Sequence, residues 1–197
     1  AVARLRALGH DPRDVRDLVL THLDLDHAGG LADFPEARVH VAKNEHAAAM
    51  ARATLFEKSR YRPAQWSHDV QWVEHAQFGE RFMGFEAVRA LDPKEPDVLL
   101  VPLTGHTRGH CAVAVRTDRG WLLHAGDAYM HHGEVHGPRR TCPPGLDWYG
   151  ALIATDRSSW VRNQDRLRAL TNAHAQSGEL TVFCAHSVDE FDALAGA

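Results

Sequence analysis

Apolar residues occur along the chain in short runs that polar, glycine-rich stretches separate. Short apolar or alternating runs predict buried strands, and longer runs with a period of about 3.6 residues predict helices. The predicted strands cover residues 17–21, 38–42, 98–103, 111–115, 121–127 and 180–185, and the predicted helices cover residues 2–8, 45 to about 57 and 158–175. Because strands and helices alternate, the pattern predicts an α/β fold.

The connecting segments carry signals of their own. Asn44 is expected to cap the helix that follows it, and the run Asp118-Arg119-Gly120 predicts a hairpin turn. Residues 61–75 are irregular and aromatic, which favours a flap, and residues 130–150 are rich in glycine, proline and histidine, which favours a long functional loop. No internal repeat or low-complexity linker interrupts the sequence, so we expect a single domain over residues 1–197.

The composition narrows the class of protein. With 197 residues and 44% hydrophobic content, the chain can bury the core of one globular domain. The formal net charge of −4 argues against nucleic acid as a partner, and no apolar run reaches the roughly 20 residues that a membrane span needs. Three scattered cysteines indicate neither a disulfide framework nor a cysteine metal site. We expect a cytoplasmic protein with a small-molecule substrate and no membrane partner, and a homo-oligomer is an open alternative.

The first predicted strand runs into a loop that holds four metal-ligand side chains within six residues. His22, Asp24 and Asp26 recur at every second position, so an extended backbone would direct them to one side, and His27 is adjacent. Two carboxylates buried beside two imidazoles are unfavourable without a cation, and a divalent metal would neutralise them. The alternative is a solvated acidic loop with incidental histidines.

Three later strands also end near potential ligands. His106 lies in the run Gly105-His106-Thr107-Arg108-Gly109-His110, Asp127 follows Ala125-Gly126, and His186 follows the last strand. Taken singly, Asp127 could merely cap a turn and His186 could be a half-buried structural histidine. Imidazole is the commonest transition-metal ligand, and the chain has 15 histidines. Their spacing therefore has to decide which of them are metal ligands and which are ordinary surface residues.

In this order, the motifs resemble those of the metallo-β-lactamase superfamily over nearly the whole chain. That family carries a His-x-His-x-Asp-His loop, a later Gly-His-Thr motif, a bridging aspartate and a final histidine. The resemblance implies an αββα sandwich and two divalent ions, zinc first, with iron or manganese as alternatives. It implies one ion held by His22, Asp24 and His106, a second held by Asp26, His27 and His186, with Asp127 bridging and His110 supporting the ligands from behind.

The resemblance also implies a hydrolase in which a metal-bound hydroxide attacks an ester, lactone or thioester carbonyl, with Asp26 orienting the nucleophile. The layout around Asp127 is similar to that of N-acyl homoserine lactonases, in which a tyrosine near the bridging aspartate contacts the substrate carbonyl. Tyr129 is the candidate for that role, although its spacing from Asp127 is one residue shorter, and a packing role is the alternative. Five aromatic residues either line an apolar pocket or pack the core: Phe56, Tyr61, Trp66, Trp148 and Tyr149.

The sequence departs from the family pattern at two places. Asp24 stands where the common motif has histidine, which lowers the net charge of the site and makes the ligand harder. A carboxylate at this position also resembles the flavodiiron branch, so an iron-dependent redox enzyme is an alternative, although no flavin domain follows. Only 21 residues precede His22, so part of the N-terminal sheet is expected to be missing, and a non-catalytic metal-binding fragment is the remaining alternative.

Overall fold

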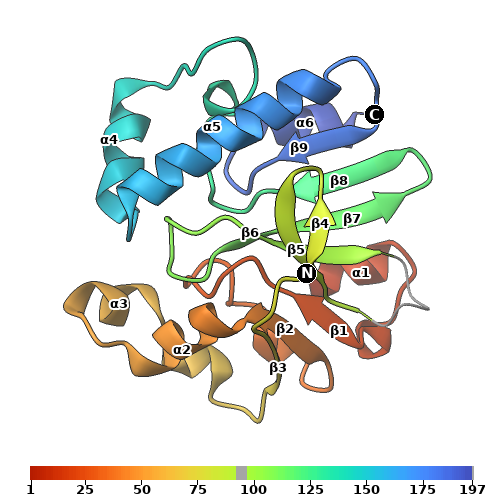
Figure 1. Cartoon of the computed structure of the whole chain (residues 1–197). Coiled ribbons are helices and arrows are strands. Elements are labelled where there is room, and N and C mark those ends of the chain that lie inside the picture. Colours follow the sequence, from red (N-terminus) through yellow and green to blue (C-terminus); the bar gives the residue numbers. More distant parts are fainter. Residues whose placement is uncertain (92–96, 197) are drawn as a thin grey trace. The chain divides into compact units, whose positions relative to one another are not determined.

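The chain folds as two units, residues 1–76 and residues 77–197, and each unit has a sheet of its own. The computed structural model describes residues 1–91 and 97–196 (Figure 1). Both units combine strands with helices, as the α/β prediction requires, but the strands do not alternate regularly with helices, since five strands follow one another within residues 80–124.

In residues 1–76, three parallel strands form a sheet in the order β1-β2-β3, where β1 is Asp17–Val19, β2 is Arg38–Ala42 and β3 is Gln71–His75. The helices are α1 (Val2–Ala7), α2 (Lys43–Ala51) and α3 (Leu55–Arg60), with 3₁₀ turns at Pro12–Asp14, Leu31–Asp33 and Pro63–Trp66. Parallel strands need crossover connections. The crossover from β1 to β2 contains the histidine-rich loop, and α2 packs on β2 and β3.

Three local predictions in this unit were wrong. The single helix expected from 45 to about 57 is two helices, because Arg52 adopts a left-handed conformation (φ 43°) and Thr54 starts α3 with a capping box to Glu57. Asn44 lies inside α2 and does not cap it, since the cap position is Ala42. The segment expected to be an irregular flap contains β3, which is specified by its pairing with β2 rather than by its own pattern.

In residues 77–197, six strands form a sheet in the order β4-β5-β6-β7-β8-β9. The strands are β4 (Glu80–Phe82), β5 (Phe85–Arg89), β6 (Val98–Pro102), β7 (Cys111–Thr117), β8 (Gly120–His124) and β9 (Leu180–Phe183). All pairs are antiparallel except β8 with β9, whose parallel connection contains α4 (Pro144–Ile153) and α5 (Arg157–His174). Helix α6 (Val188–Ala195) follows β9, and α5 packs on β9.

Sequence reasoning missed the hairpin of β4 and β5, which turns through Met83 and Gly84, both with positive φ (46° and 86°). The long loop expected over residues 130–150 is interrupted by a 3₁₀ turn at His132–Glu134, and it ends where α4 begins at Pro144. The hairpin predicted at 118–120 is confirmed as the β7–β8 turn.

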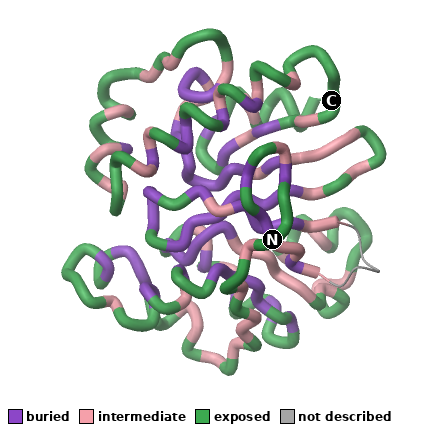
Figure 2. Tube along the Cα trace, viewed as in Figure 1, coloured by how far each residue is buried: buried purple, intermediate pink, exposed green. Residues whose placement is uncertain are grey.

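Each unit has its own apolar core, and both units contain buried stretches of chain (Figure 2). The core of residues 1–76 includes Leu23, Leu31, Val39, Val41 and Tyr61, and that of the second unit includes Leu99, Val101, Leu123, Leu167 and Val182. These cores hold the strand ends in place, and four strands, β1, β6, β8 and β9, each end three or four residues before a predicted ligand.

Candidate metal centre

The loop after β1 carries four predicted ligands, and two of them are already close. Nε2 of His22 lies 3.5 Å from Oδ2 of Asp24, and Nδ1 of the same ring lies 2.9 Å from the hydroxyl oxygen of Thr21. The Thr21 contact therefore engages one ring nitrogen and orients the other toward the carboxylate. His22 and Asp24 are buried, whereas the side chain of Asp26 is 52% exposed.

The extended backbone expected from His22 to Asp26 ends at Asp24. The amides of His27 and Ala28 both donate to the carbonyl oxygen of Asp24, at 3.0 and 2.9 Å, so the chain makes a tight turn. This turn places the His27 ring beside the His22 ring, with 4.0 Å between the ring centroids, and leaves Nε2 of His27 3.7 Å from Oδ2 of Asp26. The turn, not a shared side of an extended strand, brings His27 to His22.

A buried carboxylate holds the backbone of this loop. Glu45 of α2 is fully buried, and its Oε1 accepts the backbone N–H of Leu23 at 3.0 Å and the hydroxyl of Tyr61 at 3.2 Å. Burial raises the pKa of the Tyr61 phenol, and the nearby charges of Glu45 and Asp24 raise it further, so the phenol keeps its proton and stays a donor. Glu45 thereby fixes the peptide group between the two predicted ligands His22 and Asp24.

Arg60, the last residue of α3, forms a buried ion pair with Asp24. Its Nε lies 3.1 Å from Oδ1 of Asp24, and both side chains are at least nine-tenths buried. The guanidinium carbon of Arg60 also lies 4.9 Å from the centroid of the Phe56 ring, within the range of a cation–π contact.

In residues 77–197, three loops bring predicted ligands together at one end of the sheet. Asp127, after β8, is the central residue: its Oδ2 lies 3.4 Å from Nε2 of His106, after β6, and 3.4 Å from Nε2 of His186, after β9. His106 and Asp127 are buried, and the side chain of His186 is 43% exposed. One carboxylate oxygen therefore faces two imidazoles that the sequence separates widely.

His110, to which the family resemblance gives a supporting role, contacts the backbone of Asp127. Its Nε2 accepts the backbone N–H of Asp127 at 3.0 Å, so Nδ1 carries the proton and donates to the carbonyl oxygen of Leu103, also at 3.0 Å. The fully buried imidazole thus cross-links the end of β6 to the turn after β8.

The loops are also tied to the start of α5. Gly105 has φ +135°, and a Cβ there would lie 2.3 Å from the backbone nitrogen of Trp160, so only glycine fits. Thr155 donates to the carbonyl oxygen of His106 through its amide (3.1 Å) and its hydroxyl (3.0 Å). The indole N–H of Trp160 donates to the carbonyl oxygen of Asp127 at 2.9 Å.

Tyr129 is fully buried, and its hydroxyl donates to Oε1 of Glu190 at 2.8 Å. Glu190, on α6, also accepts the backbone N–H of Cys184 at 2.8 Å and lies 3.0 Å from Nε2 of His136. Burial opposes ionisation of Glu190, but the hydrogen bonds from His136, Cys184 and Tyr129 outweigh it and lower the pKa of this carboxyl. The contact of Tyr129 with a substrate stays a prediction.

The aromatic residues considered for an apolar pocket have different surroundings. Tyr61 is buried in the core of residues 1–76, Trp66 packs against that core, and Phe56 stacks on Arg60. Trp148 and Tyr149 of α4 are exposed.

Sequence reasoning missed three residues that support the ligands, namely Glu45, Arg60 and Glu190. Each is a charged residue on a helix, a place where solvent exposure is the ordinary expectation. The one readable signal nearby was the Thr54–Glu57 capping box, which marks the start of α3 but not the partner of Arg60.

Within each unit, the donor atoms have the chemistry and spacing that a divalent ion requires. Two ligands on a tetrahedral ion with bonds of about 2.1 Å are about 3.4 Å apart. The imidazole-to-carboxylate separations are 3.5 Å for His22 and Asp24, 3.7 Å for His27 and Asp26, and 3.4 Å for Asp127 with both His106 and His186. These nitrogen and oxygen donors suit zinc, iron or manganese.

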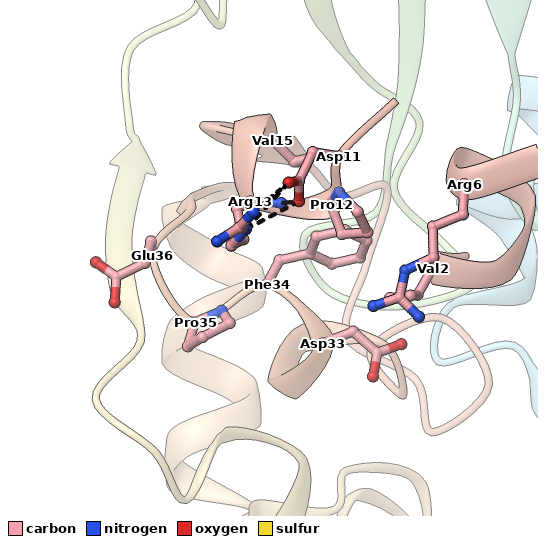
Figure 3. A pocket seen from close by; sticks show the side chains of 10 residues that line it. All are labelled: Val2, Arg6, Asp11, Pro12, Arg13, Val15, Asp33, Phe34, Pro35 and Glu36. Atoms are coloured by element: carbon pink, nitrogen blue, oxygen red, sulfur yellow. Dashed lines mark hydrogen bonds and ion pairs between the residues drawn. The ribbon is translucent and has the colours of Figure 1, made fainter. Parts of the chain in front are cut away.

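A separate pocket of about 210 Å³ lies in residues 1–76, and none of the predicted ligands lines it (Figure 3). Asp11 and Arg13 pair with each other at its edge, Phe34 contributes the apolar wall, and Arg6 reaches in from α1. The Arg13 guanidinium and backbone amide lower the pKa of Asp11 to about 2.

Residues 1–175 match the profile of the metallo-β-lactamase superfamily. The chain is 42% identical over 189 residues to a probable metallo-hydrolase of Mycobacterium tuberculosis, covering 96% of this chain and 60% of that protein. It is 28% identical over 195 residues to an N-acyl homoserine lactonase of Agrobacterium fabrum, covering 97% of this chain and 63% of the lactonase. The chain therefore belongs to the metallo-β-lactamase superfamily and spans about 60% of the length of the relatives it matches.

Solved structures show the same fold. An N-acyl homoserine lactone hydrolase with its product bound at the catalytic metal centre has a TM-score of 0.68 at 19% identity, over 98% of this chain and 64% of the hydrolase. A dizinc quorum-quenching lactonase has a TM-score of 0.62 at 16% identity, over 95% and 62% of the two chains. The predicted α/β fold of the metallo-β-lactamase type is confirmed. Among the described residues, no helix is both long and apolar enough to cross a membrane.

Proposed function

We propose that this chain provides the metal centre of a hydrolase that cleaves an ester, lactone or thioester bond. In this proposal one ion is held by His22, Asp24 and His106, a second by Asp26, His27 and His186, and Asp127 bridges the two. The observation that carries the proposal is the position of Asp127, whose Oδ2 lies 3.4 Å from Nε2 of both His106 and His186. A bridging carboxylate needs such an arrangement.

When bound, the two ions supply Lewis acidity and lower the pKa of a coordinated water to about 7. The chain's own residues position the reaction. The exposed carboxylate of Asp26 can accept a hydrogen bond from an attacking water and take its proton. His110 fixes the backbone of Asp127, and Glu45 fixes the loop at Leu23, so the ligands are held before a substrate arrives.

Similarity to N-acyl homoserine lactonases supports a lactone as the first substrate class to test, followed by thioesters and simple esters. In this proposal Tyr129 contacts the substrate carbonyl, which requires its hydroxyl to exchange Glu190 for the substrate. A Tyr129→Phe variant tests this role. Because it also removes the hydrogen bond to Glu190, kcat is measured at a temperature at which the variant stays folded: a fall in kcat supports the role, and unchanged kcat contradicts it.

The function is tested by measuring metal per chain by elemental analysis. The same preparation is assayed on a panel of a lactone, a thioester and a β-lactam, before and after chelation. We expect two equivalents of metal and a hydrolysis that chelation abolishes and zinc restores. Asp26→Ala should lose the second equivalent and the activity, whereas Asp33→Asn, at an exposed carboxylate outside the ligand set, should keep both.

Each other outcome contradicts the proposal in a different way. Iron in a coloured protein that turns over oxygen without hydrolysis would indicate a redox enzyme of the same superfamily. A chain that binds no metal would indicate a non-catalytic role.

A further inference from the structure

The carboxylate that replaces a histidine in the ligand motif has a buried cation beside it. Asp24 presents its two oxygens in different directions: Oδ1 lies 3.1 Å from Nε of Arg60, and Oδ2 lies 3.5 Å from Nε2 of His22. The Asp24 and Arg60 side chains are only 10% and 6% exposed. The pair is therefore an internal feature of residues 1–76 rather than a surface contact.

A buried ion pair of this kind is rarely retained for stability alone. Desolvating two charges is unfavourable, and apolar replacements of similar size are often neutral or stabilising. A guanidinium stays charged, and here it forms its ion pair with Oδ1 of Asp24, while Oδ2 of the same carboxylate lies nearer His22. Oδ2 lies 3.5 Å from Nε2 of the predicted ligand His22, and the Arg60 guanidinium also makes a cation–π contact with the Phe56 ring.

We propose that Asp24 and Arg60 act together as one ligand of zero net charge that replaces the neutral imidazole of the common motif. Arg60 holds Oδ1, cancels the added negative charge and presents Oδ2 to the ion beside His22. Arg60 is thus a positioning residue, and the site regains the charge that a histidine ligand would give it. The assignment rests on the proposed metal site and adds a residue that the sequence motif does not contain.

This assignment reverses the effect that the sequence motif alone would predict for the substitution Asp24→His. If Asp24 acted by itself, Asp24→His would restore the common motif and would keep or improve zinc binding. With Arg60 in place, the same substitution leaves a buried guanidinium next to the ion without its carboxylate. We therefore expect Asp24→His to weaken zinc binding by about 10- to 100-fold, the range seen when a ligand loses its supporting partner.

The experiment measures the zinc affinity of the full chain by competition with a chromophoric chelator, together with thermal unfolding of the metal-free chain. The variants are Asp24→His, Asp24→His/Arg60→Met and Asp24→Ala/Arg60→Met, with Arg62→Met, an exposed arginine nearby, as the matched control. Removing the guanidinium should rescue the histidine ligand, so the first double variant should bind zinc within about threefold of the wild type. The second double variant lacks the proposed ligand at position 24 and should bind zinc more than about 100-fold more weakly than the wild type, beyond the range for loss of a supporting partner.

The outcomes separate this assignment from the proposed function. Equal zinc affinity in both double variants and the wild type would show that Asp24 is no ligand and would overturn the assignment. Wild-type affinity in Asp24→His alone would overturn the role of Arg60. A wild-type chain that binds no zinc, iron or manganese would overturn the proposed metal site and this assignment together. Metal-free unfolding shows whether a single variant fails through misfolding, and the double variants, which bury no unpaired charge, still decide the assignment.

Discussion

The two units of the chain assemble their predicted ligands in different ways. In residues 1–76, all four ligands lie within six consecutive residues, and one turn at Asp24 brings His27 beside His22. In residues 77–197, the three ligands lie on three separate loops, and only the order of the strands brings them to Asp127. The cluster at residues 22–27, the local cluster, therefore needs only a turn to form. The cluster of His106, Asp127 and His186, the dispersed cluster, forms only when the strands of its sheet have paired.

Both units nevertheless use the same supporting device, which we call the carboxylate clamp. In each, a glutamate on a helix accepts one backbone N–H near a predicted ligand and one buried tyrosine hydroxyl. The clamps are Glu45 with Leu23 and Tyr61, and Glu190 with Cys184 and Tyr129. The dispersed cluster has further ties through His110 and Trp160, because each of its loops must be fixed against another.

The largest effect is expected when either unit loses a ligand. Asp26→Ala and Asp127→Asn should each reduce hydrolysis by more than the roughly 100-fold that loss of a supporting hydrogen bond can cause, since each removes a direct ligand. Steady-state kinetics with metal analysis checks this. If one of the two variants kept full activity, the proposal that both units supply the site would fail.

The dispersed cluster should be more sensitive to one added methyl group. Gly105→Ala combines a positive φ with a Cβ that would lie only 2.3 Å from the backbone nitrogen of Trp160, and it should destabilise residues 77–197 by about 3 kcal/mol or more. Gly79→Ala, at an open position in the same unit, is the control and should unfold like the wild type. Equal urea midpoints for the two variants would contradict the close approach of the Gly105 loop to α5.

The clamps should act locally, each in its own unit. Glu45→Gln and Glu190→Gln each weaken hydrogen bonds to a charged acceptor and should reduce stability by about 1–3 kcal/mol. Hydrogen exchange distinguishes them, because Glu45→Gln should expose the Leu23 amide and leave the Cys184 amide protected, and Glu190→Gln should do the reverse. Loss of protection at both amides in either variant would contradict independent clamps.

The smallest expected effect is a difference between Glu190→Gln and the wild type in how far acid reduces the stability of the fold. The pKa of Glu190 in the folded chain lies below its ordinary value of 4.5, so its stabilising contribution is present above pH 4.5 and is lost as the pH falls through the folded-state pKa. When unfolding is measured from pH 6 downward, the wild type should therefore lose stability as Glu190 is protonated, and the Glu190→Gln variant should lack this pH-dependent loss of stability. Glu86→Gln, at an exposed position on β5, should retain the wild-type pH profile. An unaltered profile in Glu190→Gln would contradict this assignment.

Much of the fold and the positions of the predicted ligands could be read from the sequence, because both depend on local patterns. Apolar runs predicted β2, β6, β7 and β9 close to their observed bounds, and glycine and ligand-type residues after the strands marked the loops. The hairpin of β4 and β5 and the strand β3 escaped prediction, since short strands are specified by the neighbours they pair with.

The tertiary structure decided which groups support the ligands. Nothing in the sequence around Asp24 indicates that Arg60, on a helix in the next crossover, holds one of its oxygens, or that Glu190 accepts the hydroxyl of Tyr129. Such contacts depend on where helices pack after the strands have paired, and periodicity reports only the face that a residue shares with its near neighbours. The sequence by itself therefore determined the residue types and loops of the predicted ligands, whereas the contacts that hold them, such as that of Arg60 with Asp24, were decided by the packing of distant segments.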